Sequence, residues 1–185
     1  MNELQRVQQV LSGNSSAFGY FVETYQHMAY TIAVRVCGNG QDAEDVVQES
    51  FVKAYRNLHT FRRDSRFSSW LYRIVYNTAV THSRAKVWSD VTEVDEVALP
   101  TQEGTQVEAL ETERSEMVER VLARMPKGDA VLMTLYCLEE HAVKEVAQIM
   151  GLNESNVKVR LHRARRLFKE LWVQLFGEEE YFKSI

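Results

Sequence analysis

The chain has few of the residues that interrupt or cross-link secondary structure. Its 185 residues include 2 prolines, 8 glycines and 2 cysteines. Cys37 and Cys137 are too few for a disulfide framework, so we expect two small buried residues with free thiols. No apolar run approaches the ~20 residues of a membrane span, and residues 1–10 lack the apolar segment of a signal peptide. We therefore expect a cytoplasmic protein that does not insert into a membrane.

The residues that are present favour a folded, helical protein. Hydrophobic residues make up 45% of the chain and aromatic residues 10%, which is enough to bury one modest core or two small ones. Apolar residues recur at spacings of three and four, as in amphipathic helices, and nothing alternates as a strand would. The segments that we expect to be helical are 15–37, 41–58, 67–86, 112–124, 128–139, 143–150 and 154–172.

Charge divides the chain into blocks, although the net charge is only -4. Residues 51–86 hold eight basic residues and one acid, 89–119 hold ten acids and one arginine, and 141–172 hold seven basic residues and three acids. The acidic stretch around 87–106 also has a proline and a glycine and no stable apolar period, which is typical of a linker. We expect an all-α fold made of two small helical domains at 1–86 and 112–176, a flexible acidic linker at 87–111 and a tail at 177–185.

Residues 143–171 form the most informative stretch of the second domain. A short helix with an apolar face ends at Gly151, which can adopt the left-handed conformation needed at a helix end. Asn153, or the Glu-Ser pair after it, can then cap the next helix. The apolar residues of that helix fall on one side, at Val157, Leu161, Ala164 and Phe168. Because the other side is basic, the pattern predicts a helix-turn-helix whose second helix enters the DNA major groove.

The outer side of this last helix carries the predicted DNA contacts. By side-chain type, Lys158 and Arg163 suit guanine edges. Arg160, Arg165 and Arg166 are better placed to neutralise phosphates. The full set is Ser155, Asn156, Lys158, Val159, Arg160, His162, Arg163, Arg165 and Arg166. A basic helical face can also be plain solvated surface, and for this helix taken alone that alternative stays open.

The helix expected at 41–58 offers a different kind of face. We expect Asp42 to cap it, and acids in its first turn suit the helix dipole. Its exposed strip mixes acids, an amide and an apolar residue, which suits a protein partner better than plain solvation. The predicted partner contacts are Asp42, Asp45, Gln48, Glu49 and Val52. Compensation of the dipole alone remains an alternative explanation for the carboxylates.

Residues 61–86 combine a basic loop with a helix that is basic and aromatic. Arginine holds phosphate, aromatic rings stack on bases, and Asn or Ser bonds a base edge, so this surface suits a strand with unstacked bases. The predicted contacts are Arg62, Arg63, Ser65, Arg66, Ser69, Trp70, Arg73, Tyr76 and Asn77. The residues that we expect to face inward are Phe67, Trp70, Leu71, Ile74, Val75 and Thr78. Those that we expect to point outward are Ser69, Arg73, Tyr76, Asn77 and Arg84. Tyr72 and Tyr76 suit the edge of the core equally well, and helical phase does not decide between the two places.

Three segments together resemble a known family. They are GNGQDAEDVVQESFVKAYRNL, FRRDSRFSSWLYRIVYNTA and VKEVAQIMGLNESNVKVRLHRARRLF. They look like the two blocks of a bacterial RNA polymerase sigma factor of the sigma-70 family, in particular its small extracytoplasmic-function (ECF) group. Residues 15–86 resemble sigma region 2, and 112–172 resemble region 4. The chain departs from the pattern at 140–143, where Glu-His-Ala-Val replaces the Gly-Leu-Ser-Tyr-like sequence common in the family.

The resemblance implies a role for each face. The strip on 41–58 corresponds to the surface that docks on the β′ clamp helices of RNA polymerase. The loop at 61–69 and the following helix, through Asn77, correspond to the part that opens the −10 promoter element and captures a flipped base. The last helix corresponds to the reader of the −35 element. The implied partners are core RNA polymerase, through its β′ clamp helices and β flap, promoter DNA and an anti-sigma factor. The resemblance implies no cofactor, no metal and no catalytic activity.

Two other functions compete with this interpretation. A helix-turn-helix regulator that binds duplex DNA as a dimer, without polymerase, accounts for 143–171 but leaves the other two faces without a role. A helical metal hydrolase would use Asp42, Glu44, Asp45 and Glu49, but these acids lack a Glu-x-x-His or His-Glu-x-x-His partner.

Overall fold

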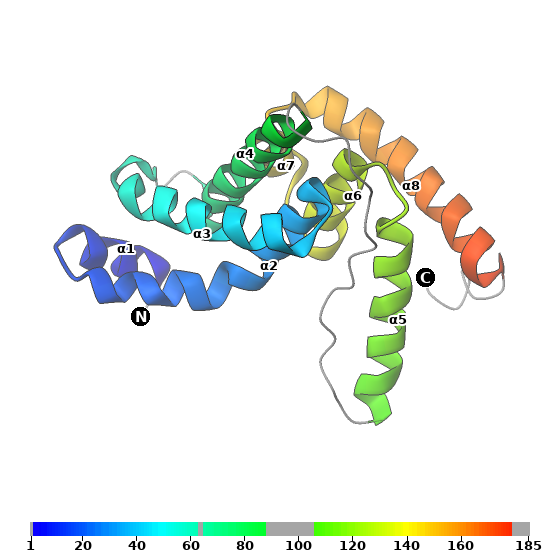
Figure 1. The fold of residues 1–185 in the computed structure, drawn as a ribbon, viewed down its shortest axis with the longest axis horizontal. Coiled ribbons are helices and arrows are strands. Elements are labelled where there is room, and N and C mark those ends of the chain that lie inside the picture. The colour runs from blue at the N-terminus through cyan, green and yellow to red at the C-terminus, as the bar shows by residue number, and fades with distance from the viewer. Residues whose placement is uncertain (1, 63–64, 88–105, 179–185) are drawn as a thin grey trace.

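The computed structural model in Figure 1 describes residues 2–62, 65–87 and 106–178, and within these ranges all regular structure is helical. The predicted all-α class is therefore confirmed. The elements are α1 (Glu3–Leu11), η1 (Ser15–Phe18), α2 (Gly19–Cys37), α3 (Gly40–Arg56), η2 (Leu58–Thr60), α4 (Phe67–Val87), α5 (Gln106–Leu122), α6 (Lys127–Met133), η3 (Thr134–Leu138), α7 (Val143–Met150) and α8 (Glu154–Phe176). Here η1 and η2 are short 3-10 helices, and η3 is a π-helical turn.

The junction between α2 and α3 shows how local chemistry sets the helix ends. Gly38 has φ 87° and closes α2 in the left-handed conformation. Asn39 then caps α3, because its Oδ1 accepts the amide of Asp42 at 2.9 Å. The Asp42 carboxylate in turn accepts the Asn39 side-chain amide at 2.7 Å. The prediction that Asp42 caps the helix is wrong. The cap position comes directly after Gly38, so the side chain of Asn39 is the one that caps the first turn.

Several other helix boundaries differ from those expected. The N-terminal helix α1 was not anticipated, and it begins with a capping box between Asn2 and Gln5. Helix α5 begins at Gln106, before the expected start at 112, while 88–105 of the predicted linker lie outside the described residues. The expected helix 128–139 consists of α6 followed by the π turn, and Cys137 within that turn is exposed. The prediction of two buried cysteines is therefore wrong: Cys37 is only half-buried.

Helix α4 lies at the centre of the packing. It contacts α2 and α3 on one side and α7 on another, and α2 also contacts α6. Of the residues that we expected to face inward, Phe67, Leu71, Val75 and Thr78 are buried, whereas Trp70 and Ile74 are half-buried. The buried residues of both halves form one continuous cluster rather than two separate cores.

Phe67 anchors the aromatic part of this cluster. Its ring stacks on Phe21 with a centroid distance of 4.1 Å, and it also meets Tyr25, Phe61 and Trp70. Only 2% of Phe67 is exposed. This cluster fixes the start of α4 and the end of the preceding basic loop, so it positions both for any function they have.

We expect Phe67→Ala to lower the free energy of unfolding by about 3–5 kcal/mol, because a fully buried ring leaves a cavity. Urea unfolding followed by far-UV circular dichroism measures the change. The exposed Leu11 provides the matched control, because Leu11→Ala should change the free energy by less than about 0.5 kcal/mol. Equal effects of the two substitutions would contradict this account of the core.

Candidate nucleic-acid and protein interfaces

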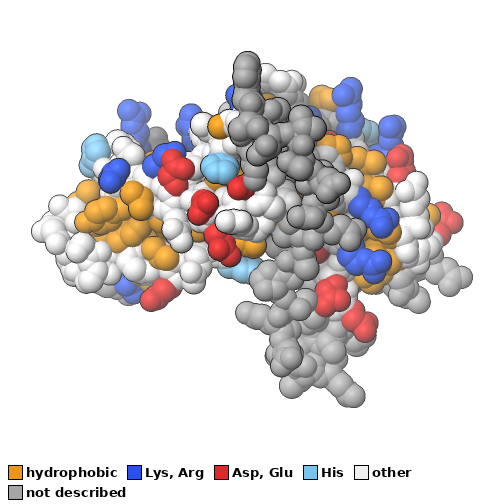
Figure 2. All heavy atoms as spheres, in the orientation of Figure 1, with side chains coloured by type: hydrophobic (Ala, Val, Ile, Leu, Met, Phe, Trp, Pro, Cys, Tyr) orange, Lys and Arg blue, Asp and Glu red, His pale blue; other side chains and the backbone are white. Residues whose placement is uncertain are grey.

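The outer side of α8 is exposed and basic, as predicted. Gly151 ends α7 with φ 68°, and Asn153 caps α8 by accepting the amide of Asn156 at 2.7 Å. Val157, Leu161 and Ala164 then turn inward. Of the predicted contacts, Ser155, Asn156, Lys158, Val159, His162, Arg163, Arg165 and Arg166 are exposed. Figure 2 shows Lys and Arg side chains projecting where α8 lies, at the upper right.

Some of the predicted DNA contacts on α8 also interact with other side chains of the protein. Arg160 is half-buried and its Nη2 lies 2.6 Å from Oδ1 of Asp129 on α6, so it ties α8 to α6. The guanidinium of Arg165 lies over the ring of Tyr136, 5.1 Å from its centroid. Val159 is 49% exposed, which is unusual for a large apolar side chain and suits contact with a thymine methyl group.

A surface cavity of about 430 Å³ lies between α3, η2 and α4. It brings together three of the residues predicted to bind an open strand, Trp70, Arg73 and Asn77. The full lining is Lys53, Asn57, Thr60, Trp70, Arg73, Ile74, Asn77, Thr78 and Thr81. One indole, two cations and several amide or hydroxyl groups give the cavity the means to stack a base, hold a phosphate and bond a base edge.

Sequence reasoning missed several of these lining residues although a signal was present. Arg73, Asn77 and Thr81 follow one another at i, i+4 and i+8, so extending the predicted line by one turn gives Thr81. Lys53 and Asn57 are also four residues apart and face the same cavity. The pairing of α3 with α4 could not be read from the periodicity of either helix.

Lys53 connects the cavity to the acidic strip on α3. Its Nζ lies 3.2 Å from Oγ1 of Thr78 and 2.7 Å from Oε1 of Glu49. The Lys53–Glu49 pair is exposed to solvent, so we expect it to exchange readily with other partners.

The remaining residues predicted to bind an open strand are not gathered at the cavity. Ser69 is 3% exposed, and its hydroxyl donates to Oε1 of Glu145 on α7 at 3.1 Å. The expectation that Ser69 points outward is wrong, because the side of α4 that carries Ser69 and Tyr72 packs against α7. Tyr76 is half-buried against the core.

The described residues of the loop before α4 are largely exposed. Arg62 and Arg66 are exposed and Ser65 is half-buried, whereas Arg63 lies outside the described residues. Nε of Arg66 lies 3.6 Å from Oε1 of Glu145, so one member of the loop already has a partner on α7.

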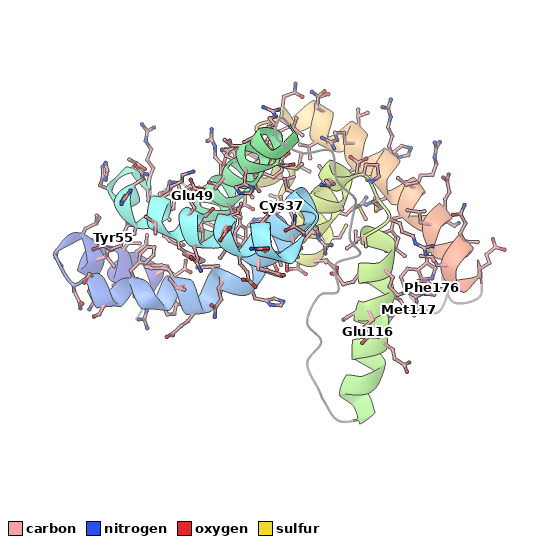
Figure 3. The ribbon with its side chains drawn as sticks, viewed as in Figure 1. Cys37, Glu49, Tyr55, Glu116, Met117 and Phe176 are labelled. Atoms are coloured by element: carbon pink, nitrogen blue, oxygen red, sulfur yellow. The ribbon has the colours of Figure 1, made fainter. Side chains whose placement is uncertain are left out.

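The exposed strip of α3 is present as predicted. Asp45, Gln48, Glu49 and Val52 are exposed, and Figure 3 shows Glu49 and Tyr55 on this helix. Tyr55 and Val52 are 44% and 48% exposed, so the strip has a larger apolar part than the sequence pattern indicated. Asp42 is half-buried and bonded to Asn39, which sets it apart from the others.

Over the described ranges, no group of three or more His, Cys, Asp and Glu residues could hold a metal ion. Within the same ranges, none of the helices is both long enough and apolar enough to cross a membrane.

Comparison with known proteins identifies the family. Residues 21–89 match the model for Sigma-70 region 2, and residues 115–168 match the model for Sigma-70, region 4. The chain is 36% identical to the RNA polymerase sigma-H factor of Pseudomonas aeruginosa, over 94% of its own length and 95% of the relative. The chain belongs to the sigma-70 family of RNA polymerase sigma factors.

Further relatives place this sigma factor in the ECF group. It is 36% identical to the ECF RNA polymerase sigma-E factor of Escherichia coli K12, over 86% of its own length and 88% of the relative. The solved structure of CnrH in complex with the cytosolic domain of CnrY is 28% identical and covers 90% of this chain and 94% of its own, with a TM-score of 0.60. The sigma factor RpoE from Bartonella quintana, solved with the anti-sigma factor NepR, shares the fold at 21% identity and a TM-score of 0.69.

Glu145 of this sigma factor carries a perturbed charge. Burial alone raises the pKa of its carboxyl, but hydrogen bonds from the Ala142 amide and the Ser69 hydroxyl, with the nearby Arg66 and His141, outweigh burial. The pKa of Glu145 therefore lies below its ordinary value of 4.5. The stabilisation from the carboxylate is complete above that ordinary value, and it is lost as the pH falls through the lower pKa of the folded protein.

We expect Glu145→Gln to lower the free energy of unfolding at pH 7, and this deficit to shrink as the pH is lowered below 4.5. Urea unfolding of both proteins at a series of pH values measures the difference. Glu23→Gln, at an exposed position on α2, is the control and should change the free energy of unfolding at pH 7 by less than about 0.5 kcal/mol. A deficit that stays constant down to acid pH would show that the charge of Glu145 does not contribute.

Proposed function

We propose that this sigma factor acts through three separate surfaces on core RNA polymerase and promoter DNA. The strip on α3 docks on the polymerase, the cavity between α3 and α4 holds part of the opened −10 strand, and the outer side of α8 reads the −35 element. The observation that carries the proposal is the cavity, because it joins an indole, two cations and base-bonding side chains at one place. The chain itself performs no catalysis, and the chemistry belongs to the polymerase.

At the −10 element, the cavity assigns a task to each lining side chain. Arg73 and Lys53 hold the backbone phosphates, Trp70 stacks on an unpaired base, and Asn77 bonds a base edge. The basic loop at 61–66 guides the strand toward the cavity by its charge. Ser69 and Tyr76 support α4 rather than the strand, since one is buried and the other packs on the core.

At the −35 element, α8 lies in the major groove. Lys158 and Arg163 bond guanine edges, Val159 contacts a thymine methyl, and His162 bonds a base or a phosphate according to the sequence. Arg165 and Arg166 neutralise phosphates. Arg160 acts mainly by fixing α8 on α6 through Asp129.

The partners follow from these surfaces. Asp45, Gln48, Glu49 and Val52 contact the β′ clamp helices, and the domain at 112–176 meets the β flap. The segment at 87–111 links the domain at 1–86, which carries the clamp-helix contact, to the domain at 112–176, which carries the β flap contact. The protein acts in the cytoplasm, where transcription takes place. An anti-sigma factor is a further partner, supported by the relative solved in complex with one.

An independent helix-turn-helix regulator is the second candidate function. The exposed basic face of α8 and the Gly151 turn support it as well as they support a sigma factor. It gives no role to the cavity or to the α3 strip, and it requires dimerisation on paired half-sites.

We expect the purified protein to co-elute with sigma-free bacterial core RNA polymerase as a one-to-one complex on a sizing column. Replacing Asp45, Gln48 and Glu49 together by Ala should abolish co-elution, because the strip then loses both its charge and its hydrogen bonds.

The control for this experiment is the double substitution Glu23→Ala and Gln26→Ala, at exposed positions on α2. It should leave co-elution intact. If the unaltered protein does not bind core polymerase, the sigma function is refuted and the regulator remains. If the triple variant still binds, docking occurs elsewhere.

We expect Arg163→Ala and Arg166→Ala to differ in kind. Loss of a base contact should relax the preference at one −35 position by about ten- to hundredfold, whereas loss of a phosphate contact should weaken all sequences alike and reduce the salt dependence by about one ion. Selection from a random promoter library by the reconstituted holoenzyme, followed by salt titration, separates these effects. Identical sequence preferences in the Arg163 variant and the unaltered protein would remove Arg163 from base recognition.

A further inference from the structure

Two arginines of α8 that suit DNA phosphates equally well by residue type lie in different surroundings. At about 100° of rotation per residue, Arg160 and Arg165 flank, on opposite sides, the buried line of Val157, Leu161 and Ala164. Both arginines meet side chains of the segment that precedes the helix-turn-helix, which consists of α6 and the π turn η3. The contacts that the two arginines make there are of different kinds.

Arg160 is held by the first turn of α6. Its Nε and Nη2 both donate to Oδ1 of Asp129, at 3.1 and 2.6 Å. Only 35% of the Arg160 side chain and 23% of the Asp129 side chain are exposed. Gly128 leaves room for this contact, since a Cβ atom at that position would lie 2.8 Å from Nη2 of Arg160. The charge of Arg160 is therefore matched inside the protein, and its guanidinium is turned toward α6.

Arg165 is placed by an aromatic ring rather than by an acid. Its guanidinium lies over the ring of Tyr136, 5.1 Å from the centroid. Tyr136 is half-buried, whereas Arg165 is exposed. A cation–π contact of this kind orients a guanidinium without cancelling its charge, because the ring is neutral. Arg165 therefore stays available to a phosphate.

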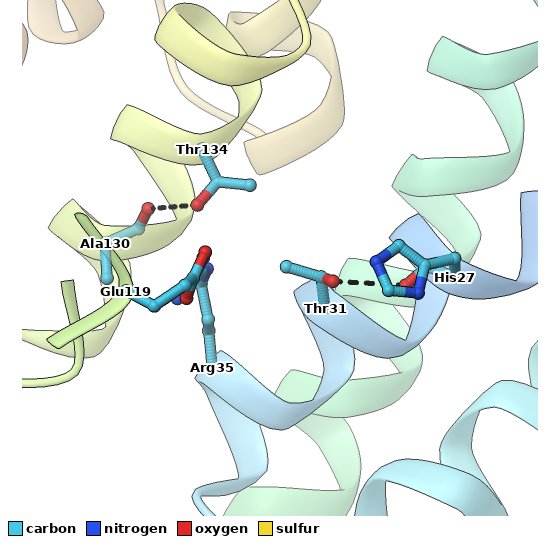
Figure 4. Close-up of polar contacts among 6 residues, drawn as sticks. All are labelled: His27, Thr31, Arg35, Glu119, Ala130 and Thr134. Carbon is cyan, nitrogen blue, oxygen red and sulfur yellow. Dashed lines mark hydrogen bonds and ion pairs between the residues drawn. The ribbon is translucent and has the colours of Figure 1, made fainter. Parts of the chain in front are cut away.

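The segment that carries Asp129 and Tyr136 is firmly packed. The two residues are seven positions apart, which is about two helical turns, and Leu132 between them is fully buried. The π turn begins at Thr134, whose buried hydroxyl donates to the carbonyl oxygen of Ala130 at 2.9 Å, as Figure 4 shows. Because α6 also contacts α8 directly, the segment can hold the two arginines in fixed positions relative to that helix.

We propose that Asp129 and Tyr136 are positioning residues for DNA binding by α8. Asp129 withholds Arg160 from the phosphates, and Tyr136 orients Arg165 toward one. This inference rests on the proposed function, because it requires that α8 holds duplex DNA. Its consequence is that α8 makes one phosphate contact fewer than its charge indicates. Contacts to base edges then supply a larger share of the binding, which favours discrimination between sequences.

The salt dependence of duplex binding tests the role of Asp129. The full-length protein is titrated with a labelled duplex of about twenty base pairs of mixed sequence, and each phosphate contact steepens the plot of log affinity against log salt by about 0.9. Arg166→Ala is the reference and should make the slope shallower by about 0.9. We expect Asp129→Ala to make it steeper by about 0.9, because Arg160 is released to a phosphate. In the double variant with Arg160→Ala, this increase should disappear.

The control for the lost charge is Glu116→Ala. Figure 3 shows Glu116 on α5, and it is exposed, so this variant removes the same formal charge without touching Arg160 and should leave the slope unchanged. Circular dichroism verifies that each variant keeps its helices. An unchanged slope in Asp129→Ala would overturn the withholding of Arg160. A shallower slope in Arg160→Ala alone would overturn it as well, whether or not the Asp129 variant folds.

Affinity for the same duplex tests the role of Tyr136. Tyr136→Leu removes the aromatic face and should lower the affinity about two- to fivefold, whereas Tyr136→Phe keeps the ring and should retain it. The slope should stay the same, because Arg165 keeps its charge. In an Arg165→Ala background, Tyr136→Leu should have no further effect. Equal losses in both backgrounds would show a purely structural role and overturn the positioning of Arg165.

The same titrations separate failure of this inference from failure of the proposed function. If Arg163→Ala, Arg165→Ala and Arg166→Ala all leave duplex binding unchanged, α8 does not hold DNA, and the −35 assignment fails together with the inference. If these three variants weaken binding while the Asp129 and Tyr136 variants behave as the unaltered protein does, the −35 assignment stands and the inference alone is wrong.

Discussion

The position of α4 determines much of the rest of the molecule. One side of this helix enters the aromatic cluster with Phe21 and Phe67, and another carries Ser69 and Tyr72 against α7. A third side, with Arg73 and Asn77, is exposed and lines the cavity. Core packing, contact between regions and the candidate binding surface therefore depend on the same twenty-one residues. A helix used in this way must be placed accurately, and the buried rings at its start provide that accuracy.

The distribution of charge explains how a net-acidic chain carries basic surfaces. Arginines and lysines project from α8 and from the loop before α4, whereas the exposed part of α3 is acidic. The ion pair between Arg35 on α2, whose side chain is 5% exposed, and Glu119 on α5, whose side chain is 29% exposed, joins the two regions. Electrostatics thus has two uses in this protein, one toward outside partners and one within the molecule.

Sequence reasoning recovered the helices and the faces that follow from local rules. The end of α7 at Gly151, the cap at Asn153 and the inward line from Val157 to Ala164 depend only on neighbouring residues. It failed where tertiary contact decides. Ser69 has the spacing of an outward residue, yet it is buried because α7, some seventy positions later, covers it. The burial of Cys137 was predicted from its residue type alone, and the residue is exposed because it lies in the π turn Thr134–Leu138, whose buried residues are Thr134 and Leu135.

The crowding of roles on α4 restricts how this protein can evolve. Arg73 and Asn77 lie on a helix whose other sides pack in the core and against α7, so a helix-breaking change at either position also disturbs both of those contacts. The outer positions of α8, such as Lys158 and His162, are exposed, so their side chains can vary without disturbing the core. Under the proposed function, divergence among descendants of this chain is expected to alter −35 preference sooner than −10 preference, by exchange of side chains on α8.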